Sequence, residues 1–251
     1  EADARVKALA EEMWQTSSHP FASSVRYGKG RIYKEASLEQ IFKDKGIVAD
    51  FRGDDPSLPL QFIHLTLSDA DVYFVSNQSA DKVCFEGNFR IQGKVPELWN
   101  PLTSEIRELP RYKTITKSTK IPIELQGFES SFIVFRKDAE AKDSDGINYP
   151  SKNVLASIDT PWTVNFQEGR GGPEGPVTFK ELSDWTVSKD LHIKYFSGTA
   201  TYTNSFKLGK LPQTPVYIDL GKVMVMAKVK VNGKYVGGVW TAPYRLNITS
   251  A

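Results

Sequence analysis

The sequence predicts a mainly β protein with two β-sandwich domains, preceded by a short remnant of an α/β domain. Three observations lead to this fold class. Helical periodicity of the apolar residues is confined to residues 1–53. Beyond that point, short runs of alternating apolar and polar residues are separated by turn residues, which is typical of a sandwich. A polar stretch at residues 139–153 divides these runs into two series.

The composition is that of a folded protein with nearly balanced charge. Of the 251 residues, 40% are hydrophobic and 25% are charged, which excludes a disordered chain. The 32 basic and 30 acidic side chains leave a formal net charge of +2. Such a balance gives no field that favours nucleic acid or an anionic membrane. No apolar run approaches the roughly 18 residues that span a bilayer, and the first residues show no signal-peptide pattern. We therefore expect neither nucleic acid nor a membrane as partner.

Residues 1–53 predict two helices on either side of a strand pair. Apolar residues recur at helical spacing over residues 1–14. Residues 25–33 are rich in β-branched and aromatic residues around a Gly-x-Gly turn, which indicates a short hairpin. Ser37 followed by Gln40 is the pattern of a capping box, so a second helix is expected to begin there. These elements are too few to bury both faces of a sheet, so the segment is interpreted as the remnant of an α/β domain.

Residues 54–138 carry the first strand series and predict a β-sandwich. The expected strands are 61–67, 71–76, 82–91, 97–99, 104–108, 113–116, 119–125 and 131–136. The next stretch, residues 139–153, is polar and rich in turn residues, so it is expected to be a linker. Its Asp-Ser-Asp-Gly at residues 143–146 is similar to a calcium loop but lacks the later carboxylates and the closing Glu. No metal site is therefore expected there.

Residues 154–251 carry the second strand series. The expected strands are 162–166, 177–179, 199–206, 215–220, 225–232 and 234–240. The clearest signal is the dipeptide Asn232-Gly233, which follows alternating apolar and basic residues. This dipeptide predicts a tight hairpin, because both turn positions need a positive φ.

Several short motifs, in one consistent order, carry a resemblance to a known family. They are Tyr-Gly-Lys-Gly-Arg at 27–31, Asp-Val-Tyr-Phe-Val-Ser-Asn at 71–77, Pro-Glu-Leu-Trp-Asn-Pro-Leu-Thr at 96–103, Tyr-Phe-Ser-Gly at 195–198, Val-Asn-Gly-Lys at 231–234 and Trp-Thr-Ala-Pro-Tyr-Arg at 240–245. The C-terminal motifs resemble the galactose-binding-like jelly roll of glycoside hydrolases, which also occurs in family 2 β-galactosidases and β-glucuronidases. Taken with the upstream motifs, the chain is most similar to the C-terminal region of family 106, the α-L-rhamnosidases.

This resemblance implies a non-catalytic scaffold, with a possible part in glycan binding, within a larger enzyme that acts on rhamnose-containing polysaccharide. In that family the acid and base lie on a (β/α)-barrel with bound calcium, which would precede Glu1. None of those positions maps onto this chain, so the resemblance implies no catalytic residue, no metal ligand and no cofactor here. The implied partners are carbohydrate and the remainder of the parent enzyme, in the periplasm or outside the cell. The jelly roll at 154–251 is expected to lack its closing strand, so its last sheet would expose an edge, borrow a strand from another chain, or belong to a proteolysed or cut fragment.

Three residues are candidates for carbohydrate binding: Trp240, Tyr244 and Arg245. Pyranose rings stack their C–H faces on indole and phenol rings, while a guanidinium group binds hydroxyl oxygens. Arg245 could equally anchor a carboxylate of a neighbouring domain. Trp162 and Trp185 are instead expected to pack in a core or at a domain seam, as large aromatic side chains usually do.

Other groups that could carry chemistry have structural interpretations. Cys84, the one cysteine, lies in an alternating strand-like run, where a buried and inert thiol is expected. The three histidines are far apart in the sequence and lack the spacing that zinc favours. The glycine-rich residues 169–176 lack the Lys-Ser or Lys-Thr of a phosphate-binding loop and are expected to form a mobile loop.

Three alternatives stay open from the sequence. The chain could be a stand-alone carbohydrate-binding module, or a fragment of a family 2 β-galactosidase or β-glucuronidase. It could also hold its own active site among its 30 acidic residues. A glycosidase site needs two carboxylates roughly 5–10 Å apart, and adjacency in the sequence does not establish that geometry.

Overall fold

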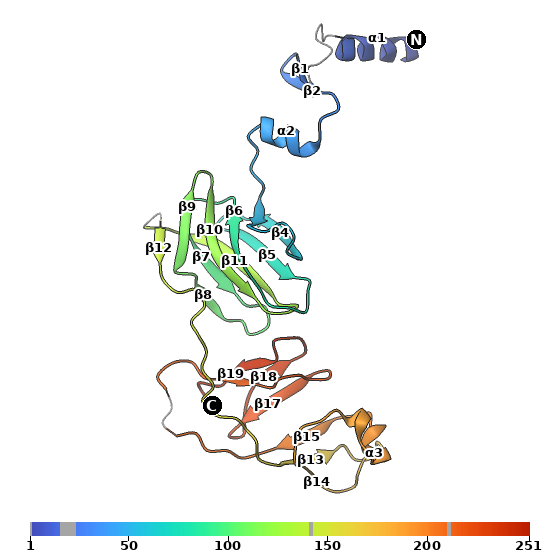
Figure 1. Cartoon of the computed structure of the whole chain (residues 1–251), viewed down its shortest axis with the longest axis vertical. Helices are drawn as coiled ribbons and strands as arrows, with labels where there is room; N and C mark the ends of the chain where they lie inside the picture. Colours follow the sequence, from blue (N-terminus) through green and yellow to red (C-terminus); the bar gives the residue numbers. More distant parts are fainter. Residues whose placement is uncertain (1, 16–23, 141–142, 210–211) are drawn as a thin grey trace. The chain divides into compact units, whose positions relative to one another are not determined.

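The computed structural model describes residues 2–15, 24–140, 143–209 and 212–251, and it is mainly β, as predicted (Figure 1). The chain divides into two compact units. One comprises Glu1–Tyr149 with Asp219–Leu246, and the other comprises Pro150–Ile218 with Asn247–Ala251.

The N-terminal segment contains two helices and one strand pair. Its elements are α1 (Ala2–Gln15), β1 (Ser24–Tyr27), β2 (Gly30–Tyr33) and α2 (Leu38–Asp44). The predicted capping box starts α2. The backbone N–H of Gln40 donates to Ser37 Oγ at 3.2 Å, and the backbone N–H of Ser37 donates to Gln40 Oε1 at 3.0 Å. None of the described residues up to Asp50 is buried. These described residues therefore have no buried core of their own, and the interpretation as a remnant stays a prediction.

Two five-stranded antiparallel sheets form the first sandwich. The order of one sheet is β12-β9-β10-β6-β3, and that of the other is β4-β5-β11-β7-β8. The strands of the first sheet are β3 (Phe51–Gly53), β6 (Val83–Phe89), β9 (Arg111–Ile115), β10 (Ser118–Leu125) and β12 (Asp143–Asp145). Those of the second are β4 (Leu60–Thr66), β5 (Asp71–Asn77), β7 (Lys94–Trp99), β8 (Ile106–Glu108) and β11 (Ser130–Asp138).

The core of this sandwich is centred on aromatic rings from both sheets. The Phe89 ring lies 4.8 Å from Phe51, 5.1 Å from Tyr73 and 5.6 Å from Phe135, measured between ring centroids. Phe51 and Phe89 belong to one sheet, while Tyr73 and Phe135 belong to the other. The inward faces of the two sheets therefore meet in one hydrophobic core.

The last strand of the sandwich lies inside the stretch expected to be a linker. β12 pairs with β9, and the nearby Asn148 is only 3% exposed. The Asn148 side chain donates to the carbonyl oxygens of Arg111 and Pro122 and accepts from the Arg111 N–H at 2.6 Å. The expected linker at 139–153 thus includes part of the sandwich. A polar edge strand held by a side-chain amide leaves no hydrophobic periodicity in the sequence.

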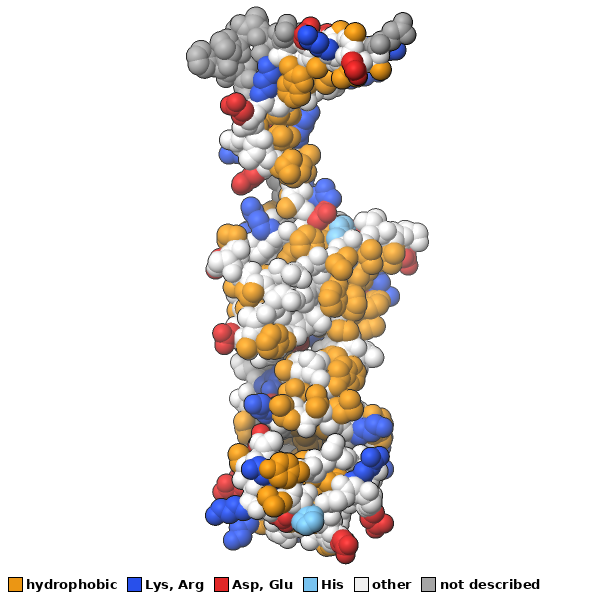
Figure 2. Space-filling view, turned by 90° about the vertical axis from the view of Figure 1, so that its right-hand side faces the viewer, with side chains coloured by type: hydrophobic (Ala, Val, Ile, Leu, Met, Phe, Trp, Pro, Cys, Tyr) orange, Lys and Arg blue, Asp and Glu red, His pale blue; other side chains and the backbone are white. Residues whose placement is uncertain are grey.

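Apolar side chains also cross the outer face of the second sheet. One row of cross-strand neighbours runs over all five strands: Ile63, Phe74, Phe132, Trp99 and Ile106. At its two ends, Ile63 is 60% and Ile106 is 52% exposed. Figure 2 shows hydrophobic side chains gathered on the side of the sandwich that carries β4. We call these five residues the apolar row.

A β-bulge in β11 changes the direction of its side chains. The register between β11 and β7 shifts between Phe135 and Lys137. In a regular strand, neighbouring side chains point to opposite faces. Here Arg136 Nε lies 2.7 Å from one oxygen of Glu97, and Lys137 Nζ lies 2.8 Å from the other. The bulge therefore lets two consecutive cations reach one carboxylate.

A three-stranded antiparallel sheet and two short helices form the second packed region. The elements are β13 (Trp162–Phe166), β14 (Val177–Phe179), β15 (Ala200–Thr203), the 3₁₀ helix η1 (Trp185–Val187) and α3 (Leu191–Lys194). Its buried cluster consists of Val164, Phe166, Ile193 and Phe196. Trp162 and Trp185 pack against this cluster, which confirms their predicted place in a core.

Two two-stranded sheets complete the C-terminal part. They pair β16 (Tyr217–Asp219) with β19 (Arg245–Asn247), and β17 (Ala227–Val231) with β18 (Lys234–Val239). Between β17 and β18, Asn232 has φ 50° and Gly233 has φ 78°. The hairpin predicted from this dipeptide is confirmed.

Candidate functional site

The three residues predicted to bind carbohydrate lie on the connection from β18 to β19. Trp240 follows β18 directly and is 56% exposed. Tyr244 is half-buried and precedes Arg245, the first residue of β19. Within the described part of the chain, no ring contact or side-chain hydrogen bond joins Trp240 to Tyr244. The segment offers an exposed indole, but its binding role stays a prediction.

Arg245 is held by a carboxylate on the neighbouring strand. Its Nη2 and Nε atoms donate to Asp219 Oδ2 at 2.5 Å and 3.1 Å. The other oxygen, Asp219 Oδ1, accepts from the Gly221 N–H at 2.9 Å. The carboxylate that Arg245 contacts therefore lies on the paired strand β16, and the predicted contact with a carboxylate of a neighbouring domain stays a prediction. A partly exposed ion pair can still donate to and accept from the hydroxyl groups of a ligand.

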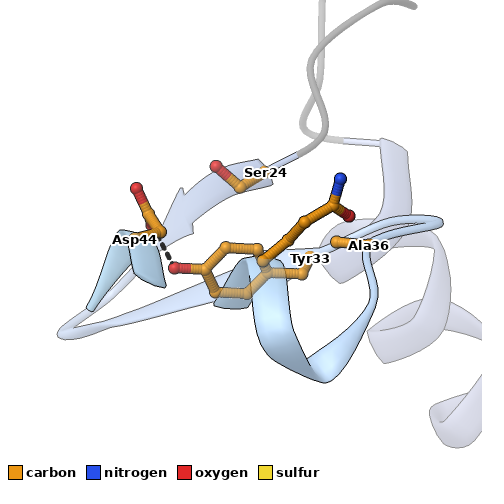
Figure 3. Close-up of a pocket in the computed structure, with 5 residues that line it drawn as sticks. Ser24, Tyr33, Ala36 and Asp44 are labelled. Atoms are coloured by element: carbon orange, nitrogen blue, oxygen red, sulfur yellow. Dashed lines mark hydrogen bonds between the residues drawn. The ribbon is translucent and has the colours of Figure 1, made fainter. Parts of the chain in front are cut away.

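A second candidate site is a pocket in the N-terminal segment (Figure 3). The pocket has a volume of about 240 Å³ and is lined by Ser24, Tyr33, Ala36, Gln40 and Asp44. Its walls come from the pair of strands β1 and β2, the turn after β2, and α2. No sequence signal indicated this pocket, because its lining residues are of ordinary types and up to 20 positions apart. Only the pairing of β1 with β2, together with the placement of α2, brings them together.

Hydrogen bonds fix the polar groups of this pocket. The Tyr33 hydroxyl donates to Asp44 Oδ2, and Arg31 Nη1 lies 3.4 Å from the same oxygen. Arg31 Nη1 also donates to Ser24 Oγ at 3.2 Å. The hydrogen bond to Asp44 raises the pKa of Tyr33, so the phenol stays protonated as a donor. The carboxylate thus has a defined orientation at the pocket.

The buried carboxylate of the first sandwich has the wrong electrostatics for an acid catalyst. Glu97 is 1% exposed, and burial alone would raise its pKa. Hydrogen bonds from Arg136, Lys137 and the Trp99 indole N–H outweigh burial and hold the pKa of Glu97 at about 2. A glycosidase acid needs a raised pKa to be protonated near neutral pH. Glu97 is therefore a structural carboxylate.

A histidine at the edge strand β4 lies between two carboxylates. His64 Nε2 is 3.0 Å from Asp71 Oδ1, and Nδ1 is 3.6 Å from Asp50 Oδ1. The imidazole ring stacks on the buried Tyr73 ring at 4.0 Å. Arg90 Nη2 pairs with the same oxygen of Asp50. Burial raises the pKa of Tyr73 well above its usual range, and the negative charges of Asp50 and Asp71 add to this effect. The network ties β4 to the rest of the sandwich.

Cys84 is exposed, so the expectation of a buried thiol is wrong. Its strand neighbours Val83 and Phe85 are both buried, and successive side chains of a strand alternate between faces. Residue 84 must therefore point outward.

Two further findings concern metals and membranes. Within the described ranges, no three His, Cys, Asp or Glu side chains gather where they could hold a metal ion. Among the same residues, no helix combines the length and the apolar character needed to cross a bilayer.

The antiparallel sheets are accompanied by similarities to glycoside hydrolases. Residues 1–114 match the sequence model of glycoside hydrolase family 106, described as α-L-rhamnosidase. The structure is similar to that of a rhamnosidase from Novosphingobium sp. PP1Y, with a TM-score of 0.87 and 33% sequence identity. That similarity covers 98% of this chain and 23% of the rhamnosidase. The chain is thus a glycoside-hydrolase-associated region, and its similarity is to family 106.

A shorter similarity is to a protein of Formosa agariphila that carries the name of a β-glucuronidase. The two are 44% identical over 77 residues, which is 30% of this chain and 7% of that protein. The chain therefore spans less than a quarter of either relative.

Proposed function

We propose that this chain is a non-catalytic scaffold and glycan-binding portion of a larger glycoside hydrolase that acts on rhamnose-containing polysaccharide. One observation carries the proposal: nearly the whole chain is similar to less than a quarter of a rhamnosidase polypeptide. A region that makes up so small a share of an enzyme can support the fold without holding the reacting groups. Location in the periplasm or outside the cell is part of the same proposal.

The apolar row supports the scaffold part of the proposal. Monomeric soluble proteins rarely leave contiguous apolar patches uncovered, and larger patches mark interaction surfaces. Here the row crosses every strand of one sheet and ends in two exposed isoleucines. We propose that another domain of the parent enzyme packs on this face.

The electrostatics of the buried carboxylate support the non-catalytic part. Glu97 is held ionised by two cations and an indole N–H, which is the opposite of what an acid catalyst needs. The purified chain should therefore release no product from aryl α-L-rhamnosides, β-galactosides or β-glucuronides. Turnover of any of these substrates would overturn the non-catalytic assignment.

The exposed indole of Trp240 supports the glycan-binding part. If the contact of the indole with a pyranose face is of the size found for aromatic pairs, about 0.5–1.5 kcal/mol beyond area burial, Trp240→Ala should weaken binding by up to about tenfold. Calorimetric titration of the wild-type chain with rhamnose-containing oligosaccharides is expected to show saturable heat. Trp14→Ala is the matched control, since Trp14 is also exposed, at 49%, but lies on α1. Equal affinity for wild type and Trp240→Ala would remove Trp240 from the site.

A second candidate glycan is favoured by the Formosa agariphila protein, because its name is that of a β-glucuronidase. In that case the chain would belong to an enzyme that acts on uronic acid glycans. Titration with glucuronate-containing oligosaccharides, at the same concentrations, separates the two candidates.

A further inference from the structure

We infer that the pocket lined by Ser24, Tyr33, Ala36, Gln40 and Asp44 is a second sugar-binding site, selective for one neutral 6-deoxyhexose residue. The inference deepens the proposed glycan-binding role and rests on it only for the choice of sugars. The pocket and the Trp240 segment share no residue, so each can fail without the other.

The size of the pocket limits what it can hold. Sites for drug-sized ligands occupy about 300–1,000 Å³. A volume of about 240 Å³ lies below that range and suits a single monosaccharide. Because the pocket is open to solvent at the surface of the N-terminal segment, the sugar can be one residue of a longer chain.

The polar lining matches a set of sugar hydroxyl groups. Asp44 Oδ2 is already oriented by Tyr33 and Arg31, and a carboxylate has further acceptor capacity for ligand hydroxyls. Gln40 Oε1 accepts from the Ser37 N–H, which leaves the amide nitrogen as the donor of that side chain. Ser24 Oγ accepts from Arg31, so its own hydroxyl hydrogen is available to donate. The pocket therefore offers both donors and acceptors in fixed positions.

The apolar lining favours a deoxy sugar. The Tyr33 ring provides a surface for the C–H face of a pyranose. In Figure 3 the phenol oxygen points to Asp44, while the Ala36 methyl lies towards the other end of the ring. A methyl group at C6 can pack against Ala36, whereas a hydroxyl at that position would lose hydrogen bonds to water.

The charge of the pocket excludes acidic sugars. Asp44 is the carboxylate in the lining, and Arg31 is already paired with it. A uronate carboxylate would lie close to a like charge, which disfavours binding. The names of the two relatives suggest two different sugars, rhamnose and glucuronate. The charge of the pocket favours binding of rhamnose over glucuronate.

Amide NMR of the isotope-labelled chain, titrated with methyl α-L-rhamnopyranoside, tests the inference. Saturable shifts are expected for amides of residues 24–44, with a Kd on the order of millimolar for so small a ligand. L-mannose methyl glycoside, which differs by a hydroxyl on C6, should bind about tenfold more weakly. Methyl glucuronide should give no saturable shifts in this segment.

Two variants in the pocket and one control variant outside it locate the binding site. Ala36→Phe fills the pocket without removing a hydrogen bond, so it should abolish the shifts at residues 24–44. Asp44→Asn keeps the shape of the side chain but removes its charge, so it should weaken rhamnoside binding and allow methyl glucuronide to bind comparably. Trp240→Ala should leave the shifts at residues 24–44 unchanged, which separates this site from the proposed one.

Three results would overturn the inference. They are the absence of saturable shifts in residues 24–44 of the wild-type chain, equal binding of rhamnoside and glucuronide by the wild type, and unchanged selectivity in Asp44→Asn. If rhamnoside shifts only the Trp240 indole signal, the proposed glycan-binding role survives and the second site does not.

Discussion

The first sandwich and the three-stranded region at residues 162–203 reach stability in different ways. In the sandwich, two sheets face each other, and rings such as Phe89 and Tyr73 are completely buried. In the three-stranded region, one sheet is covered by two short helices, and the buried Phe166 and Phe196 are surrounded by aromatic side chains that are only partly buried. Two facing layers bury side chains from both sides, whereas a single sheet depends on whatever covers it.

The buried polar side chains follow the same division. Those that the structure describes are Asn77, Glu97, Ser118, Thr119, Ser131 and Asn148, and all lie in the first sandwich. Most buried polar groups have partners in fixed positions. Hydrogen bonds hold Asn77, Thr119, Glu97 and Asn148, whereas Ser131 Oγ has no hydrogen-bond partner among the described residues. The first sandwich therefore depends on hydrogen-bond geometry as well as on apolar burial, while the second region depends on aromatic packing.

The largest expected effect comes from truncating one buried aromatic side chain in the core of each region. Phe89→Ala should lower the free energy of unfolding of the sandwich by about 3–5 kcal/mol, because Phe89 is fully buried among three rings. Phe166→Ala should cost less, about 2–3 kcal/mol, because several side chains packed against the buried Phe166 are only partly buried and can relax around the loss. Urea unfolding followed by amide hydrogen exchange in each region measures both. Phe62→Ala, at a side chain that is 41% exposed, is the control and should cost about 1 kcal/mol. A larger cost for Phe166→Ala than for Phe89→Ala would reverse the comparison.

The second largest expected effect is a pH-dependent contribution of Glu97 to the stability of the first sandwich. The pKa of Glu97 is lowered to about 2, so its contribution is complete above its unfolded pKa near 4.5 and is lost as the pH falls towards 2. Glu97→Gln should therefore destabilise the sandwich by about 2–3 kcal/mol at pH 7 and by almost nothing at pH 2. Thermal unfolding across this pH range checks the difference. Glu108→Gln, at a more exposed partner of Lys137, is the control. A pH-independent cost of Glu97→Gln would show that shape, and not charge, is what the site requires.

The smallest effect concerns the surface of the sandwich. Because Cys84 points outward, a thiol reagent should label the folded chain under native conditions. Cys84→Ser should change the free energy of unfolding by no more than about 0.5 kcal/mol. Labelling that requires denaturant would mean that the outer face of β6 is covered in solution.

Strand positions could be predicted where side-chain alternation and turn residues agree. The expected strands 162–166 and 177–179 have the same bounds in the structure, and the Asn232-Gly233 hairpin forms as predicted. β12 could not be predicted, because its residues are polar and its place depends on Asn148 and β9. Cys84 was assigned to the wrong face, because cysteine is usually buried in such strands, whereas here its buried neighbours Val83 and Phe85 fix which face residue 84 occupies.

The candidate sites also differ in how far the sequence could predict them. Trp240, Tyr244 and Arg245 could be named because they are consecutive or nearly so and have suitable chemistry. Their local geometry, including the pairing of Arg245 with Asp219, depends on two strands distant in the sequence. The pocket around Tyr33 and Asp44 had no sequence signal, because it arises from the packing of a strand pair with a helix.

The bulge in β11 has a consequence for how this sheet can vary. Arg136 and Lys137 both contact Glu97 because the strand contains one residue more than its partner requires. The number of positive charges that meet the carboxylate is thus set by the length of the strand as well as by its side chains. Removing that extra residue would restore regular pairing and leave a single cation to meet Glu97, so a one-residue deletion at the bulge should halve the positive charge at this carboxylate.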